Sequence, residues 1–139
     1  MTMVLTKSLA EKFLLEQGEN QEKVKNALCG FDFDKAVYIQ QLEEGDELFQ
    51  YMRTFSYSGN WFALKGASME DLAIFGGNEG RVLKKVRIKY PCLALEGIAK
   101  SLQRNWHWSG GGAGGGTQIY MPSKFVLSCI EIIGPVKHA

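Results

Sequence analysis

Hydrophobic residues recur at helical spacing near the N-terminus. Residues 6–17 carry an apolar stripe and stop at a glycine, which predicts an amphipathic helix. Ser8 and Glu11 have the spacing of a capping box at its start. A second short helix is predicted from Asn20, as its N-cap, to Gly30. We expect both helices to serve as a structural packing element. Their expected buried residues are Leu9, Ala10, Phe13, Leu14, Val24, Ala27 and Leu28.

From residue 31 onward, apolar and polar residues alternate, which is the pattern of half-buried strands. Within residues 47–53, for example, Leu48 and Gln50 fall on one face and Phe49 and Arg53 on the other. The alternation predicts an α+β domain whose mostly antiparallel or mixed sheet has about six strands. Short helical segments are expected after Ser68 and at residues 97–103. The segments expected to form strands are residues 36–42, 47–53, 60–63, 81–90, 92–95, 117–121 and 125–133.

A glycine-rich segment lies late in the chain. Six glycines occupy the seven positions from 110 to 116, after an aromatic connector that contains Trp106 and Trp108. Such a run weakens helices and strands, so it predicts a flexible loop or a backbone that passes close to a ligand. Gln118 follows it, a polar amide at the start of an apolar strand. We therefore expect function to lie near Gln118.

Composition changes this picture little. The 139 residues are 45% hydrophobic and 22% charged, as in one soluble globular domain. The formal net charge of +1 does not favour nucleic acid or an anionic membrane as a partner. Cys29, Cys92 and Cys129 lie in apolar surroundings without metal-binding spacing, which predicts reduced, buried thiols. No signal peptide and no run of transmembrane length is found, so export would need a dedicated delivery system.

The common catalytic signatures are missing from the sequence. It has no GxSxG, HExxH or P-loop motif and no carboxylate cluster with metal-ligand spacing. His107, between two tryptophans, fits a packed or surface histidine better than a catalytic base, and His138 lies at the terminus. Arg53 ends an aromatic strand face, where an arginine either borders the core or clamps an anion. Of the adjacent aromatics Trp61 and Phe62, one is expected in the core while the other lines a cleft.

Three motifs occur in a characteristic order along the chain. They are Arg53 at the end of an early strand, the Asn60-Trp61-Phe62 strand, and a Gly-Gly-Gly-Thr-Gln-Ile-Tyr turn that ends at Tyr120. In this order, and in the segment 30–37, the chain resembles toxin domains of the ADP-ribosyltransferase fold over about residues 9–135. It looks most like polymorphic toxin type 46, the C-terminal toxin of Rhs-type effectors. Its glycine turn is similar to that of the tuberculosis necrotizing toxin group of NAD glycohydrolases.

The resemblance implies an ADP-ribosyltransferase-like core of split mixed or antiparallel sheets around a cleft that holds NAD, with no metal. One domain would span residues 1–139, with a helical packing element at 1–30 and a catalytic β core at 31–139. By position, the catalytic residues are Arg53, which pairs with the pyrophosphate or the nicotinamide-side ribose, and Gln118, which touches that ribose where many members carry a glutamate. The implied NAD-binding residues are Arg53, Asn60, Trp61, Phe62, Thr117 and Gln118.

The chemistry of NAD cleavage is consistent with this set. Breaking the glycosidic bond generates an oxocarbenium-like ribose, so a preorganised polar group beside the ribose is the main demand on the protein. Gln118 can orient the ribose hydroxyls, but it lacks the negative charge that a glutamate supplies. Glu96 and Glu131 are further carboxylates in the chain, and no spacing argument places either of them in the cleft.

Two activities fit such a site, and a third hypothesis comes from another class. We favour a mono-ADP-ribosyltransferase that modifies a cytoplasmic macromolecule of a competing bacterium and inhibits growth. The near-neutral charge favours a protein acceptor over RNA. The alternative is an NAD glycohydrolase that depletes NAD. The third hypothesis is a non-catalytic protein-binding module. The resemblance also implies secretion by a delivery system, action in the target-cell cytoplasm without a membrane partner, and a cognate immunity protein that blocks the cleft.

Overall fold

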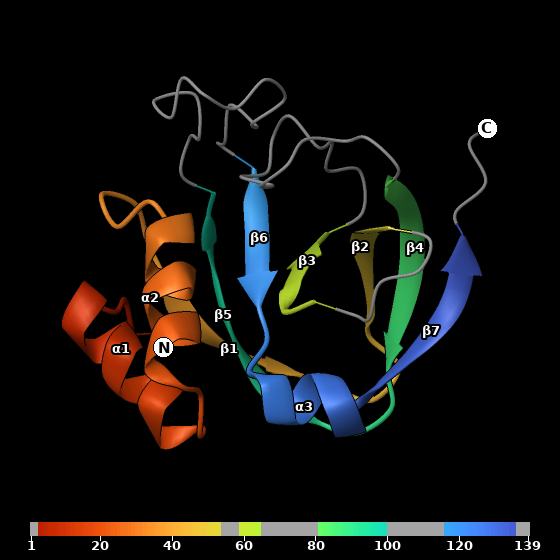
Figure 1. Cartoon of the computed structure of the whole chain (residues 1–139), viewed down its shortest axis with the longest axis horizontal. Coiled ribbons are helices and arrows are strands. Elements are labelled where there is room, and N and C mark those ends of the chain that lie inside the picture. Colours follow the sequence, from red (N-terminus) through yellow and green to blue (C-terminus); the bar gives the residue numbers. More distant parts are fainter. Residues whose placement is uncertain (1–2, 54–58, 65–80, 100–115, 136–139) are drawn as a thin grey trace.

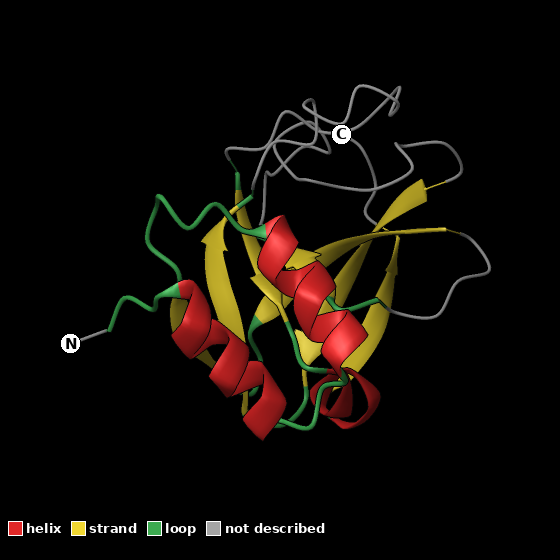
Figure 2. Cartoon of the chain, turned by 60° about the vertical axis from the view of Figure 1, so that its left-hand side comes forward, coloured by secondary structure: helices red, strands yellow, loops and turns green. Residues whose placement is uncertain are grey.

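The computed structural model describes residues 3–53, 59–64, 81–99 and 116–135. These residues form a strongly curved sheet with α1 and α2 packed across one face (Figure 1, Figure 2). None of the described helices is both long and apolar enough to cross a membrane. The elements in chain order are α1 (Lys7–Glu16), α2 (Gln21–Gly30), β1 (Tyr38–Leu42), β2 (Glu47–Arg53), β3 (Trp61–Ala63), β4 (Arg81–Ile88), β5 (Cys92–Ile98), β6 (Thr117–Tyr120), α3 (Ser123–Ser128) and β7 (Ile130–Pro135).

The sheet has seven strands in the order β1-β5-β6-β3-β2-β4-β7, and neighbouring strands are antiparallel. The α+β class with an antiparallel sheet is therefore confirmed. The expected division into separate sheets is not found among the described strands, because β3 joins β2. That junction is narrow: Phe49 and Ala63 form its single register pair, whereas β2 and β4 are paired from Glu47 to Arg53.

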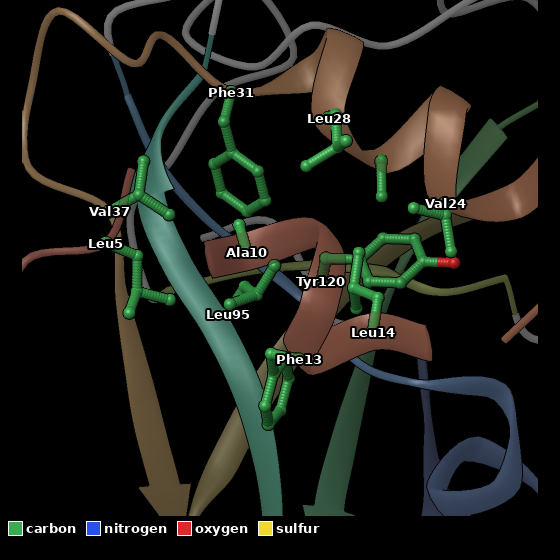
Figure 3. Close-up of a cluster of buried hydrophobic side chains, with 11 residues drawn as sticks. Leu5, Ala10, Phe13, Leu14, Val24, Leu28, Phe31, Val37, Leu95 and Tyr120 are labelled. Atoms are coloured by element: carbon green, nitrogen blue, oxygen red, sulfur yellow. The ribbon is translucent and has the colours of Figure 1, made fainter. Parts of the chain in front are cut away.

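The first hydrophobic cluster lies between the two N-terminal helices and the sheet (Figure 3). Helices this short are marginal by themselves, so burial of their apolar stripes against the sheet supplies most of their stability. Both helices pack against the sheet in this way, although Leu9 is 41% exposed and does not belong to the buried stripe. The cluster consists of Leu5, Ala10, Phe13, Leu14, Val24, Ala27, Leu28, Phe31, Val37, Leu95 and Tyr120.

A second cluster lies on the other side of the sheet, which we call the inner face; the side turned toward α1 and α2 is the helix face. Side chains alternate between these faces along each strand. Met121 and Ile119 therefore belong to the inner face, and Tyr120 between them belongs to the helix face. The inner-face cluster consists of Leu42, Leu48, Phe62, Val86, Ile88, Cys92, Ala94, Ile119, Met121 and Cys129.

A buried carboxylate connects the helical region to the C-terminal part of the chain. Glu19, in the α1–α2 connection, is 6% exposed and accepts hydrogen bonds from the Tyr120 hydroxyl at 2.5 Å and from the Ser123 backbone N–H at 2.7 Å. Burial, and next the hydrogen bond to Glu19, raises the pKa of the Tyr120 phenol above its usual range. These two contacts satisfy a charge that would otherwise be costly to bury.

The two helices follow the sequence pattern closely, with one correction at the start of α1. Asn20 caps α2 as predicted, and Gly18 adopts a φ of +86° after α1. The N-cap of α1 is Thr6, whose side chain accepts from the Leu9 backbone N–H at 3.2 Å. The predicted capping box at Ser8 is therefore wrong. Because the helix already begins at Lys7, Ser8 lies inside its first turn.

Two predicted elements near the C-terminus are also corrected. The helical turn expected at residues 97–103 is wrong where the structure describes it, because β5 continues to Ile98. Gly97 permits this close packing: a Cβ at this position would lie 2.8 Å from the Phe31 ring. The strand expected at 125–133 begins only at Ile130. Residues 123–128 form α3, which lets the consecutive Phe125 and Val126 pack on the same cluster, whereas a strand would send them to opposite faces.

Two predictions of burial are wrong as well. Tyr90 was expected to continue an apolar strand face, yet it is 58% exposed because β4 ends at Ile88. Cys29 was expected in the core, yet it lies on the exposed side of α2. Cys92 and Cys129 are buried as predicted, and all three cysteines are free thiols. Burial, and next the neighbouring Cys129, raises the pKa of the Cys92 thiol to about 12.

Candidate functional site

The two predicted catalytic residues, Arg53 and Gln118, lie on strands β2 and β6, which β3 separates. Arg53 ends β2 and pairs with Arg81 at the start of β4. Thr117 and Gln118 begin β6, where Gln118 pairs with Ala63 of β3. Because β6, β3, β2 and β4 follow one another with antiparallel neighbours, β6 and β4 run in opposite directions through the sheet. Gln118 is level with Ala63 and, through it, with Phe49, which lies four residues before Arg53, so the strand register does not bring Arg53 and Gln118 together.

The Gln118 side chain is buried and held by the last residue of α2. It is 3% exposed, and its Nε2 donates a hydrogen bond to the Gly30 carbonyl oxygen at 2.6 Å. Its strand neighbour Tyr120 shares the helix face, so Gln118 lies beneath the end of α2. The amide thus satisfies one of the carbonyl groups that a helix leaves without an internal partner.

Trp61 and Phe62 point to opposite faces, as their adjacency predicts. Phe62 is 2% exposed within the inner-face cluster. Trp61 is half-buried on the helix face, with its ring centroid 5.2 Å from that of Phe31 and 5.0 Å from that of Tyr120. Gly30 is needed for this packing, because a Cβ there would lie 2.5 Å from the indole ring. Phe62 is therefore the member of the pair that lies in the core, whereas Trp61 packs at the border of the first hydrophobic cluster.

The side chain of Asn60 is engaged in hydrogen bonds within the protein. Its Nδ2 donates to the Met121 carbonyl oxygen and to the Ser123 hydroxyl, both at 2.9 Å. Its Oδ1 accepts from the Lys23 ammonium group at 3.3 Å, and the same ammonium reaches the Ser123 hydroxyl at 2.9 Å. These contacts fix the start of β3 to the turn after β6 and to α2. They assign Asn60 a structural role in this geometry.

The predicted NAD-binding residues are divided between the two faces of the sheet. Thr117, which is half-buried, shares the inner face with Ile119 and Phe62, whereas Gln118 and Trp61 belong to the helix face. A single ligand on one face cannot contact both sets of side chains in this geometry. The glycine-rich segment 110–115, Trp106, His107, Trp108, Ser68 and His138 lie outside the described residues.

A carboxylate that sequence spacing could not place lies on the inner face beside Ile119 of β6. Glu96 of β5 pairs with Tyr38 of β1 in register, and the Tyr38 hydroxyl donates to its carboxylate. This hydrogen bond, and next burial, raises the pKa of Tyr38 to about 12. Since the two residues are 58 positions apart, only the β1–β5 pairing reveals the contact. Glu131, by contrast, pairs with Arg87 and lies exposed on the edge strand β7.

Gln50 is a further polar residue of the inner face that the functional predictions left out. It is 5% exposed, and its Nε2 donates to the Trp61 carbonyl oxygen at 2.8 Å and to the Gly59 carbonyl oxygen at 2.9 Å. A signal for it was present in the sequence, because Gln50 is a polar residue between Leu48 and Met52 on an apolar strand face.

A groove of about 620 Å³ lies between α1 and α2, away from these residues. Both charged and apolar side chains line it, including Lys7, Glu11 and Leu28, and the exposed Cys29 lies at its border. None of the predicted site residues contributes to it. The groove therefore gives no support to the NAD-binding site that the sequence predicts.

The fold is shared with two solved structures of protein complexes. One solved structure with this fold is Tse6 in complex with Tsi6, which has a TM-score of 0.72 and 24% identity over 89% of this chain and 90% of that chain. Another is Rhs1-CT in complex with its cognate immunity protein RhsI1, with a TM-score of 0.56, 23% identity and the same coverage. No protein-family model matches the sequence, and no curated protein sequence matches it. At these identities the likeness establishes a shared fold.

Proposed function

We propose that this domain is an antibacterial effector toxin that acts on NAD as a mono-ADP-ribosyltransferase. The observation that carries the toxin assignment is the fold shared with Tse6 and Rhs1-CT, both of which were solved in complexes with protein partners. The match spans 89% of the chain in each case, so it includes the helices and the sheet together. The NAD assignment rests on the order of the sequence motifs that contain Arg53, Asn60-Trp61-Phe62 and Gln118.

In the proposed reaction, NAD extends between the end of β2 and the start of β6. Arg53 pairs with its phosphates, because a guanidinium group matches phosphate oxygens in charge and geometry. Gln118 orients the nicotinamide-side ribose as positive charge develops there. Its Nε2 donates to the Gly30 carbonyl oxygen, so in this role the amide oxygen of Gln118 accepts hydrogen bonds from the ribose hydroxyls.

NAD hydrolysis is the second candidate. Gln118 is neutral and already hydrogen-bonded to a backbone carbonyl, so it is poorly suited to activate an acceptor nucleophile. Water needs less positioning by the protein than a macromolecular acceptor does. If Glu96 approached the acceptor it could supply the missing charge, but in this structure its carboxylate is occupied by Tyr38.

Incubation with labelled NAD and a bacterial lysate distinguishes the candidates. A labelled macromolecular band is the outcome expected for transfer, and protease sensitivity of the band identifies a protein acceptor. Free ADP-ribose without a band indicates hydrolysis instead. Intact NAD, measured with protein shown to be folded by circular dichroism, excludes both activities and leaves the non-catalytic binding module.

Variants test the roles of the two residues. Arg53→Ala and Gln118→Ala are expected to lower NAD turnover by about two orders of magnitude, as when a transition-state hydrogen-bond donor is removed. Arg87→Ala is the matched control, since Arg87 lies on the solvent side of β4 and contacts Glu47 at 3.8 Å. Unchanged turnover in both site variants would remove them from the reaction.

The proposed protein partner is an immunity protein that fills the space between Arg53 and Gln118. It would compete with NAD, so adding it should raise the apparent KM for NAD and leave kcat unchanged at saturating NAD. A complex structure in which the partner contacts only α1 and α2 would contradict this placement.

A further inference from the structure

The Gln50 side chain takes over part of the backbone ladder between β2 and β3. Phe49 and Ala63 form the only register pair of these strands in the part of the chain that the structure describes. Past this pair, Gln50 Nε2 donates to the Trp61 carbonyl oxygen at 2.8 Å and to the Gly59 carbonyl oxygen at 2.9 Å. A side chain of β2 thus reaches the backbone of β3 at the point where the register of the two strands ends.

The Trp61 carbonyl group points from β3 toward β2. The preceding carbonyl oxygen, that of Asn60, faces β6 instead, because it accepts from the Met121 backbone N–H at 2.8 Å. Successive carbonyl groups along a strand point to opposite edges, so those of Trp61 and Ala63 face β2. The hydrogen bond from Gln50 to Trp61 is consistent with this orientation. An acceptor for a backbone N–H of β2 is therefore in place on β3.

A longer ladder between β2 and β3 would use the acceptor that Gln50 now occupies. In the register of Phe49 with Ala63, the next opposite pairs are residues 50 with 62 and 51 with 61. The Tyr51 backbone N–H would then donate to the Trp61 carbonyl oxygen, as in any hydrogen-bonded antiparallel pair. Strands in a ladder lie only about 4.8 Å apart, which leaves no room for a glutamine side chain between them. The side-chain bond and the longer ladder therefore exclude each other.

The observed arrangement leaves one group of Gln50 unsatisfied. Its Oε1 has less than 1 Å² of accessible surface, and no group in the described part of the chain donates a hydrogen bond to it. A flip of the amide brings no relief, since Oε1 would then meet the carbonyl oxygens of Gly59 and Trp61, which only accept. A buried unpaired acceptor lowers stability by an amount of the same order as the two donated bonds contribute. Release of the side chain therefore requires little free energy.

We infer that Gln50 is a latch that holds the β2–β3 hairpin open, and that its release lets the hairpin close as far as Tyr51 and Trp61. β3 keeps its pairing with β6 in both states, because that ladder uses its other edge. β2 keeps its long ladder with β4, which extends from Glu47 to Arg53. Closing therefore moves β2 and β4 together toward β3, and the end of β2 moves relative to β6. This conformational device is independent of the proposed reaction.

Amide hydrogen exchange, followed residue by residue by NMR, tests the latch. Gln50→Met removes the side-chain donors and the buried acceptor while nearly retaining the length of the side chain. We expect its Tyr51 N–H to exchange at least about tenfold more slowly than in the wild-type protein, because the freed Trp61 carbonyl oxygen accepts from it. A nuclear Overhauser contact between the Hα atoms of residues 50 and 62 identifies the closed register, since the Cα atoms of such a pair lie about 4.5 Å apart. Gln41→Met, at an exposed position of β1, is the matched control and should keep the wild-type exchange rate of Tyr51.

A latch and a plain structural support give opposite results. If Gln50 only supports β3, the Tyr51 N–H of folded Gln50→Met exchanges no more slowly than in the wild-type protein and the closed-register contact is missing, which overturns the latch. Thermal unfolding shows whether the variant folds. If it does not, Gln50→Asn, whose amide is one methylene too short to reach Trp61, is measured in the same way and judged by the same criterion. Failure of both variants to fold also overturns the latch, because a side chain that is released readily is not indispensable for folding.

Discussion

Two buried glutamine side chains are held by backbone carbonyl groups. Gln118 donates to Gly30, and Gln50 donates to Gly59 and Trp61. An amide is suited to both positions because it is a neutral donor. Burying a charged side chain there would cost more free energy. The sequence pattern predicts Gln118 at the start of a strand. It does not predict its hydrogen-bond partner Gly30, which lies 88 residues earlier in the chain.

A carboxylate at position 118 should destabilise the fold at neutral pH. Gln118→Glu replaces the donor that faces the Gly30 carbonyl by a buried acceptor, so we expect a loss of about 1–3 kcal/mol in the free energy of unfolding. Burial raises the pKa of such a carboxyl, so the loss should shrink as pH falls and the protonated acid becomes a donor. Urea unfolding at several pH values measures both effects. Gln41→Glu on β1 is the control, and equal losses in the two variants would contradict the role of burial.

Gly30 should not tolerate a methyl group. In Gly30→Ala, the added Cβ meets the Trp61 ring at 2.5 Å, so the indole or the end of α2 has to shift. We expect a cost of about 1–3 kcal/mol from this overpacking. Trp61→Phe removes the ring atoms that clash, so the double variant should lose less than the sum of the two single losses. Denaturant unfolding of all three variants, with Asn26→Ala on the exposed side of α2 as control, tests the coupling; strictly additive losses would disprove it.

At the scale of elements, local signals predicted the helices well and the C-terminal region poorly. Asn20 and Gly18 are local determinants, and they act in the structure as the sequence indicates. Residues 123–128 carry a β-like composition, yet they form α3 because Phe125 and Val126 both pack on the inner-face cluster. Such a preference comes from tertiary packing, which no local pattern contains.

The connection between α1 and α2 should depend on the hydroxyl of Tyr120. Tyr120→Phe leaves the buried Glu19 carboxylate with the Ser123 backbone N–H and without its phenol donor. A hydrogen bond to a charged group is worth about 1.5–3 kcal/mol, so a stability loss in that range is expected. Tyr90→Phe serves as the control because Tyr90 is 58% exposed and should change little. Thermal and urea unfolding give the comparison, and a neutral Tyr120→Phe would mean that the pair contributes nothing.

For the whole molecule, the sheet class was predictable and its strand order was not. Alternation along residues 47–53 gives a strand, but the narrow contact of β2 with β3 depends on residues that are distant in the chain. The motif order in the sequence singled out Arg53 and Gln118 as candidate site residues, and their roles stay predictions. The assignment of Thr117 and Gln118 to opposite faces required the register of β6.

The folded protein should lose stability in alkaline solution. The pKa of Tyr38 rises from 10.0 to about 12 and that of Cys92 from 9.0 to about 12, so the native state holds these protons more tightly than the unfolded chain does. Their contribution is complete below pH 9 and is lost as pH rises from about 9 to 12, since the unfolded chain releases its protons first. Urea unfolding at stepwise increasing pH should show this decline. Tyr38→Phe should flatten the part above pH 10, and an unchanged slope would contradict the Tyr38 assignment.

The place of β6 in the sheet has a consequence for how the protein folds. Without β6, the strand order separates into β1-β5 on one side and β3-β2-β4-β7 on the other. The joining strand, residues 117–120, follows β1 to β5 in the chain, and it also carries the phenol that accompanies the buried Glu19. The strands made before it therefore cannot close into one sheet until residues 117–120 are available, and folding dominated by such distant pairings is slow.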